Sequence, residues 1–222
     1  MENIKTAKIS GWALLLMALI AGYSLGYAYP ILYNSENASS SKSIMLQNIE
    51  LYHGMLIGIL LILILDLIVS FSLYEFFKKD HAKISFVACS LRIIYTIIFA
   101  IAAFYLIKNI NIEEISNDFI NYNFKNFQFI WSIGLILFGV HLLLIGVLMK
   151  LHKKIPKILW ILTLIGGVSY ILVHLIKIMF FNLEYVYYLE MILAIPMALG
   201  ELGLAIWLIV KGGKSQVNYL YK

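Results

Sequence analysis

Six long apolar runs, each 22–24 residues in length, account for most of this 222-residue chain. They cover residues 9–32, 54–77, 84–107, 127–149, 158–180 and 189–210. A helix needs about 20 mostly apolar residues to cross a bilayer, whereas a strand of a membrane barrel alternates apolar and polar residues over about 10. Because the runs are continuous, they predict an all-α integral membrane protein. We expect a six-transmembrane-helix bundle that forms one domain over residues 1–222.

The composition agrees with a chain whose main partner is the lipid bilayer. Hydrophobic residues make up 62% of the sequence and charged residues 13%, against about 45–50% and 25% in ordinary globular domains. This excludes a soluble enzyme, a disordered chain and a disulfide scaffold. The net charge is +5, and the charged residues lie mostly in short loops between the runs. Their position is explained by membrane orientation, so we expect no nucleic-acid partner. The single Cys89 cannot form an intrachain bridge.

Lysines mark one side of the predicted membrane. If the N-terminus is cytoplasmic, the inner segments carry 12 lysines and the outer segments carry three, which are Lys42, Lys108 and Lys125. Cytoplasmic loops of membrane proteins are enriched in Lys and Arg. The count therefore predicts a multi-pass protein of the cytoplasmic membrane with both termini inside the cell.

The connections between runs differ in length. Residues 78–83 and 150–157 are short and predict tight hairpin turns. The loop near 34–43 is rich in Ser and Asn and is expected to be mobile. Residues 108–126 fit either a short amphipathic helix on the outer leaflet or an ordinary polar loop. Glycines four apart, at 22 and 26 and at 54 and 58, predict close helix packing within the chain.

Four polar residues within the runs form a candidate intramembrane cluster. They are Asp66, Arg92, His141 and Glu201. Each costs roughly 2.5–3.5 kcal/mol near the bilayer centre if it faces lipid, so they should face the bundle interior. Arg92 stays charged at any relevant pH and needs a carboxylate; Asp66, on the neighbouring run of a hairpin, is the natural first partner, and Glu201 can supply a second.

A secondary polar stripe runs along the fifth run. Tyr170, His174 and Lys177 recur at helical spacing on one face. We expect Lys177 to reach toward Glu184 or Glu190 at the outer surface instead of joining the cluster. Pro196 lies inside the sixth run and predicts a helix kink.

Three stretches carry a resemblance to a known family. They are residues 72–77 with 84–102, residues 137–171, which read LFGVHLLLIGVLMKLHKKIPKILWILTLIGGVSYI, and residues 193–213, which read LAIPMALGELGLAIWLIVKGG. Together they resemble the prokaryotic membrane family known as domain of unknown function 4386. The resemblance implies a polytopic membrane protein, here expected in a bacterium, and singles out Arg92, His141, Pro196 and Glu201. It implies no substrate, cofactor or reaction.

These observations leave three hypotheses for function. The first is a polar interior that binds or conducts a small solute or a proton, with His141 as a neighbour that handles protons. The second is a structural or accessory membrane protein whose buried charges only fix helix packing. The third is an intramembrane enzyme. The sequence shows no nucleophile–base pair, metal motif or phosphate loop, which counts against this hypothesis. We therefore predict no catalytic, cofactor-binding or metal-binding residues and no cofactor.

Overall fold

The computed structural model describes residues 2–33, 39–179 and 184–212. Every secondary-structure element within these ranges is helical. Five helices of the described chain are long and apolar enough to cross a membrane, and they cover residues 4–32, 49–107, 117–151, 157–179 and 188–210. The predicted fold class, all-α with helices of membrane type, is confirmed at this level.

The first of these helices contains an unexpected π-helical segment. Helix α1 (Glu2–Ala21) continues through η1 (Gly22–Ala28) into α2 (Tyr29–Leu32). The packing role predicted for the glycines at 22 and 26 is wrong, because a Cβ atom at Gly22 would meet no atom within 4 Å. A π turn holds an extra residue, which rotates the helix face that follows. The glycines at 54 and 58 do pack closely, against the side chains of Tyr23 and Ser24 in η1.

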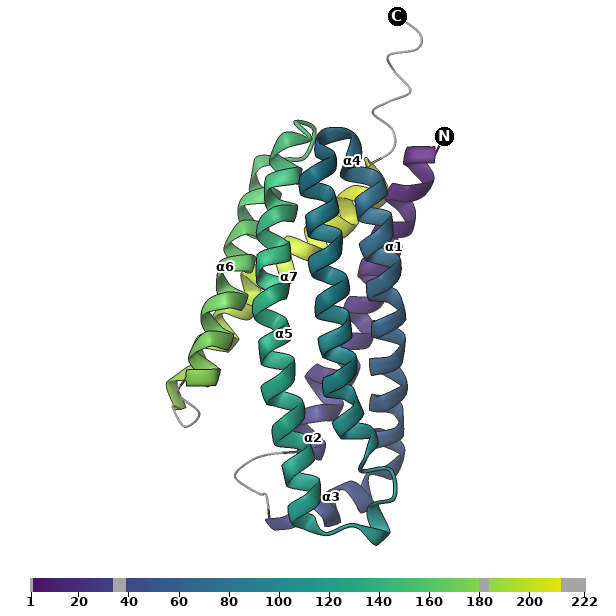
Figure 1. The fold of residues 1–222 in the computed structure, drawn as a ribbon, viewed down its shortest axis with the longest axis vertical. Helices are drawn as coiled ribbons and strands as arrows, with labels where there is room; N and C mark the ends of the chain where they lie inside the picture. Colours follow the sequence, from purple (N-terminus) through teal and green to yellow (C-terminus); the bar gives the residue numbers. More distant parts are fainter. Residues whose placement is uncertain (1, 34–38, 180–183, 213–222) are drawn as a thin grey trace, which may run out of the picture.

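Helix α4 (Ile49–Ile107) holds the second and third predicted runs together with the turn between them. Its backbone leaves helical geometry at His81, where φ is −161° and ψ is 95°. The chain then reverses, so that α4 consists of a first arm (49–80) and a second arm (82–107), which Figure 1 shows side by side. The Tyr52 hydroxyl donates a hydrogen bond of 2.6 Å to the Leu106 carbonyl, which fixes the far ends of the two arms against each other.

Helix α5 (Asn117–Leu151) begins earlier than the sequence suggested. The Ser116 hydroxyl caps it by accepting a hydrogen bond from the Phe119 N–H at 3.2 Å. The prediction of one loop or surface helix over residues 108–126 is therefore wrong, because its second half belongs to this long helix. The first half contains the short 3₁₀ turn η3 (Ile112–Glu114).

A small cap closes the end of the bundle near this turn. Helix α3 (Ser41–Gln47) lies there, and Lys42 Nζ donates hydrogen bonds to the carbonyls of Glu113 at 3.0 Å and Ile115 at 2.8 Å. The predicted mobile loop near 34–43 is therefore helical from residue 41 onward, while residues 34–38 lie outside the described ranges.

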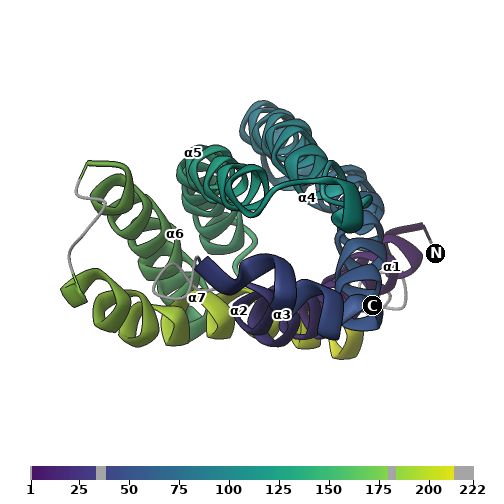
Figure 2. The ribbon, with the colours of Figure 1, turned by 90° about the horizontal axis from the view of Figure 1, so that it is seen from below.

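The long helices form a ring that α6 (Lys157–Met179) and α7 (Glu184–Val210) complete. In the described chain, α1 contacts α4 and α7, α4 contacts α5, α5 contacts α6, and α6 contacts α7. Figure 2, which views the bundle from below, shows the helices in this order. We call the end with the first residues of α1 and the last residues of α7 the terminal end, and the opposite end, with α3 and η3, the loop end.

Two hydrophobic cores fill the ring, one above the other. The core toward the loop end contains aromatic residues such as Phe99, Phe124 and Phe127, and the core toward the terminal end contains Phe76 and Phe77. Large apolar side chains also cover the outside of the ring, as expected of a surface that faces lipid; these include Leu19, Ile64 and Ile97. The predicted polar cluster lies where the two cores meet.

Candidate functional site

Three of the four predicted cluster residues are joined by hydrogen bonds through Arg92. Asp66 lies on the first arm of α4, Arg92 on the second arm and His141 on α5. All three are about 1% exposed. The hairpin brings Asp66 opposite Arg92, and the packing of α5 against α4 adds His141.

Arg92 and Asp66 form a buried ion pair, as the hairpin argument predicted. Arg92 donates from Nε at 2.9 Å and from Nη2 at 2.7 Å, and both bonds end on Asp66 Oδ1. The second carboxylate oxygen, Oδ2, is buried and has no hydrogen-bond partner among the described residues. Charge-assisted bonds of this length are strong, yet half of the carboxylate is still able to accept.

His141 holds the other side of the guanidinium. Its Nδ1 lies 2.8 Å from the Ala88 carbonyl, which can only accept, so Nδ1 carries the proton. Nε2 then has a free lone pair, and it accepts a hydrogen bond from Arg92 Nη1 at 3.3 Å. The histidine is therefore neutral in this arrangement. Phe138 lies 5.2 Å from the guanidinium carbon and adds a cation–π contact.

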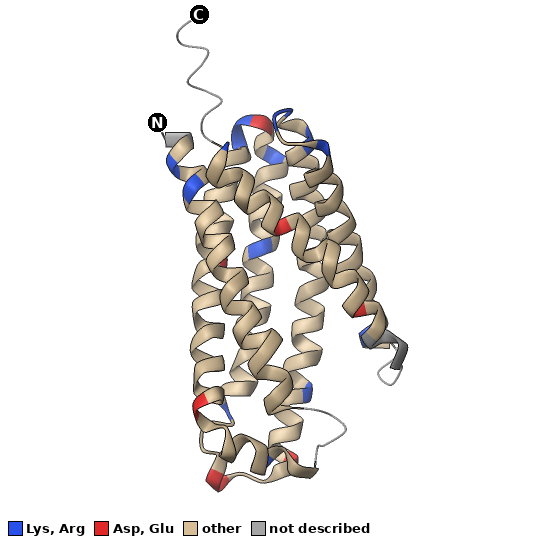
Figure 3. Ribbon diagram, turned by 180° about the vertical axis from the view of Figure 1, so that it is seen from behind, with Lys and Arg blue, Asp and Glu red and all other residues tan. Residues whose placement is uncertain are grey.

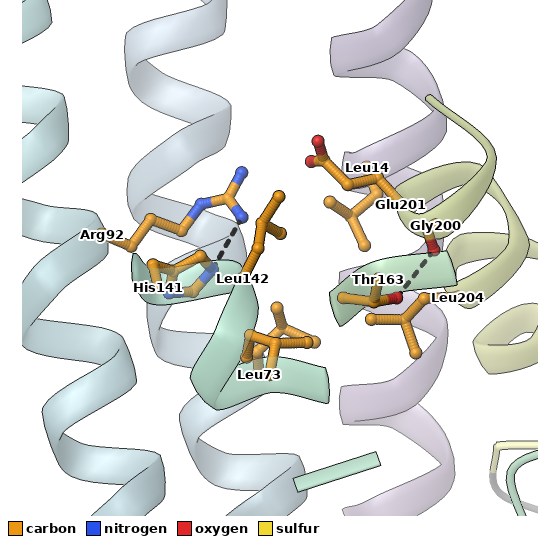
Figure 4. A pocket seen from close by; sticks show the side chains of 10 residues that line it. Leu14, Leu73, Arg92, His141, Leu142, Thr163, Gly200, Glu201 and Leu204 are labelled. Carbon is orange, nitrogen blue, oxygen red and sulfur yellow. Dashed lines mark hydrogen bonds between the residues drawn. The ribbon is translucent and has the colours of Figure 1, made fainter. Parts of the chain in front are cut away.

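Glu201, the fourth predicted residue, faces Arg92 across a small pocket without touching it. Figure 4 shows the carboxylate and the guanidinium on opposite sides of this space. Glu201 makes no hydrogen bond or ion pair with any part of the chain that the structure describes. The pocket contains about 10 Å³ of space that water can reach, which is room for about one water molecule. Every long helix of the ring lines it; the lining residues include Leu14, Leu73, Arg92, His141, Thr163 and Glu201.

A close crossing of α6 and α7 positions Glu201. A Cβ atom on Gly200 would lie 2.9 Å from the Cα of Thr163, so only glycine permits this approach. The Thr163 hydroxyl donates to the Leu159 carbonyl at 3.0 Å and lies 3.4 Å from the Gly200 carbonyl. The next residue, Glu201, is thereby held at the pocket wall.

The chain matches one family of known proteins along almost its whole length. A family model described as "Domain of unknown function (DUF4386)" matches residues 9–212. The chain belongs to this family. An uncharacterized protein of the archaeon Archaeoglobus fulgidus is 29% identical over 159 residues, which cover 72% of this chain and 84% of the relative. No solved structure matches significantly. Because that relative is archaeal, the comparison does not support the expectation of a specifically bacterial protein.

The secondary polar stripe of this family member lies beside the cluster and leads away from it. Tyr170 packs edge-to-face on Phe138 with ring centroids 5.3 Å apart, and His174 Nδ1 lies 3.3 Å from the Ser132 hydroxyl. Lys177 pairs with Glu190 at 2.5 Å, with both side chains about one-third exposed. Lys177 therefore stays outside the central contacts. Helix α7 continues through Pro196, and the predicted kink there stays a prediction.

Three further residues at the site were not predicted. Met17 of α1 places its sulfur 3.6 Å from Arg92 Nη2, and Phe138 and Tyr95 pack together with ring centroids 4.8 Å apart. Tyr95 follows Arg92 by three residues and Phe138 precedes His141 by three, so helical spacing could have indicated both. Met17 could not be found in this way, because it lies on α1 and not on a helix that carries one of the predicted cluster residues.

Proposed function

We propose that this DUF4386 protein crosses the cytoplasmic membrane six times, with both termini inside the cell. Each arm of α4 is long enough to cross alone, since residues 49–80 and 82–107 extend about 48 Å and 39 Å at 1.5 Å per residue, against about 30 Å of hydrocarbon. Lysines gather at the terminal end, which Figure 3 shows in blue. Positive loops favour the cytoplasmic side, and this supports the orientation.

A reporter fusion tests this topology. A reporter that is active only outside the cell should give no signal when it follows Lys222 and a strong signal when it is inserted near Ser40. The difference follows from the lysine distribution. The reverse pattern would contradict the orientation, and activity at both positions would contradict the even number of spans.

We further propose that the central site binds or conducts a proton or another small polar solute. The observation that carries this is the unpartnered Glu201 facing a buried Arg92 whose charge Asp66 already balances. With His141 neutral, an ionised Glu201 leaves the site with one net negative charge. Glu201 is partly buried, and a charge that is held there without a partner is costly. Uptake of a proton or a small cation removes it, so Glu201 is the group that would carry the exchanged ion.

One observation favours the alternative of a structural cluster. Asp66, Arg92 and His141 are almost fully buried, and Arg92 is hydrogen-bonded to each of the other two. Such groups can fix helix register without any ligand. Two observations stand against it: the buried Oδ2 of Asp66 has no hydrogen-bond partner among the described residues, and the partly buried Glu201 has no ion-pair partner among them. A purely structural cluster gains nothing from unpaired acceptors.

Proton flux into liposomes distinguishes the two. Purified protein is reconstituted with a trapped pH dye, and a potassium gradient with valinomycin drives proton entry. Glu201→Gln should reduce the flux by roughly 100-fold, as when a proton-transfer group is removed from an enzyme. Glu190→Gln is the matched control on the same helix and should leave the flux unchanged. If wild-type protein conducts no better than empty liposomes, or if both variants behave alike, the structural alternative holds.

A further inference from the structure

An apolar groove lies between α6 and α7 at the terminal end of the bundle. Leu159 of α6 lines one side of it, and the α7 residues that line it are Gly203, Ile206, Trp207, Val210 and Lys211. Its volume is about 310 Å³, far more than the water-sized pocket beside Arg92. We call it the α6–α7 groove. All its lining residues except Lys211 are apolar, so its main occupant must be apolar as well.

The shape of the groove suits one extended apolar chain. Ile206 and Val210 are 54% and 50% exposed, whereas Trp207 is only 6% exposed and forms the base. A Cβ atom on Gly203 would lie 2.6 Å from Leu159 Cδ2, so the two helices come together at this depth. From residue 203 to residue 210, α7 rises about 10 Å at 1.5 Å per residue. This is about two-thirds of the hydrocarbon of one leaflet, since the whole hydrocarbon core is about 30 Å thick.

A free positive charge marks the end of the groove at the membrane surface. Lys211 is exposed and makes no ion pair with any residue that the structure describes. Two acids near the same end, Glu75 and Asp80, already pair with Lys78 and His152. An anion from outside the described chain can therefore bind at Lys211 without displacing an acid of the protein.

Further lysines strengthen the positive potential around this end, which Figure 3 shows in blue. The connection from α5 into α6 contributes four of them, which are Lys150, Lys153, Lys154 and Lys157. A second copy of the chain is a poor occupant, because a two-fold contact through the groove would bring two such groups of lysines together. Basic pockets between membrane helices are instead typical binding sites for anionic lipid headgroups.

We propose that the α6–α7 groove binds an anionic phospholipid of the leaflet at the terminal end. One acyl chain lies along Leu159, Ile206 and Val210, and the phosphate lies at Lys211. A zwitterionic lipid offers the same chain but no net negative charge for the lysine, so the site should select by headgroup. This inference does not depend on the proposed proton function, because the groove does not include Arg92 or Glu201.

Native mass spectrometry of the full chain tests the headgroup selection. Purified protein in detergent is titrated with dioleoylphosphatidylglycerol, which is anionic, or with dioleoylphosphatidylcholine, which has the same chains and no net charge. We expect one phosphatidylglycerol to bind more tightly than phosphatidylcholine, and Lys211→Gln to weaken its binding about fivefold. Lys83→Gln is the matched control, since Lys83 is also exposed but lies on α4, which contacts neither α6 nor α7 in the described chain. Equal affinity for the two lipids, or equal effects of the two variants, would overturn the proposal.

Filling the groove tests the position of the acyl chain. Ile206→Trp places an indole in the groove and leaves Lys211 intact, so phosphatidylglycerol should bind about tenfold more weakly, as expected when about two CH₂ groups lose their contact. Ile192→Trp is the control on the same helix, because Ile192 is 62% exposed and lies outside the groove. Binding by Ile206→Trp as tight as wild type would refute the proposal.

The same spectra report the other possible occupant and separate this inference from the proton function. If wild-type protein is a lipid-free dimer that Ile206→Trp converts to monomers, the groove holds a second copy and the proposal is overturned. Because the readout is the mass of bound lipid and not proton flux, a failed flux experiment leaves this inference standing.

Discussion

Arg92→Leu is expected to lower the free energy of unfolding by about 3–5 kcal/mol, the usual cost of breaking one side of a buried ion pair. The substitution leaves Asp66 Oδ1 without its two donors and His141 Nε2 without its one donor. Both groups are about 1% exposed, so water cannot replace the lost bonds easily. Proton uptake by Asp66 would recover part of the loss. Thermal melting of the detergent-solubilised protein measures the effect.

Lys177→Met is the matched control for this variant. It also removes a cation from a membrane helix, but Lys177 and its partner Glu190 are both about one-third exposed. Exposed ion pairs contribute about 0–1 kcal/mol, so this variant should melt close to wild type. A loss as large as that of Arg92→Leu would show that Lys177 belongs to the central site, and wild-type melting of Arg92→Leu would refute the buried pair.

A triple variant separates structure from function at the same site. Replacing Asp66, Arg92 and Glu201 together by apolar residues of similar size removes the charges and the unpaired acceptors at once. Buried ion pairs replaced in this way often cost nothing or even stabilise a protein. The triple variant should therefore recover most of the stability that Arg92→Leu loses. If it also conducts protons like wild type, the cluster is structural; if it folds but does not conduct, the cluster is a working site.

The sequence predicted the pairing of Arg92 and Asp66 because both lie on one hairpin, where chain connectivity decides which helices are neighbours. It could not predict that His141 accepts from Arg92, because that contact depends on how α5 packs against α4. It also suggested Glu201 as a direct second partner. The structure instead leaves a water-sized gap between them, and such a gap depends on the crossing at Gly200, which only the packed helices define.

The structure departs from the sequence-based predictions at two segments, and each departure has a local cause. Residues 117–126 resembled a loop because Asn, Asp and Lys recur there, although Ile120 and Phe124 repeat at helical spacing and are fully buried. The π-helical segment at 22–28 is invisible to a pattern based on 3.6 residues per turn. The two glycine pairs have the same spacing, but only the pair at 54 and 58 packs closely, against side chains of the π-helical segment; Gly22, in the other pair, has open space beside it.

A comparison of two glycine substitutions is expected to give stability changes of opposite sign. Helices α5 and α6 touch backbone to backbone at Gly139 and Gly167; a Cβ atom on Gly139 would lie 2.7 Å from the Gly167 carbonyl oxygen. Backbone cannot move aside as a flexible side chain can. Gly139→Ala should therefore cost about 1–3 kcal/mol, the usual cost of overpacking. It should also loosen His141, which is two residues further along α5.

Gly22→Ala is the matched control, since Gly22 is also helical but has open space where a Cβ atom would stand. Replacing glycine by alanine inside a helix gains roughly 0.5–1 kcal/mol when nothing clashes. Melting curves of the two variants in one detergent should thus move in opposite directions from wild type. Proton flux should fall only in Gly139→Ala, because only that substitution displaces a helix that holds Arg92 in place. If Gly139→Ala melted at or above the wild-type temperature, α5 and α6 could not be in backbone contact, and the position of His141 at the site would be wrong with it.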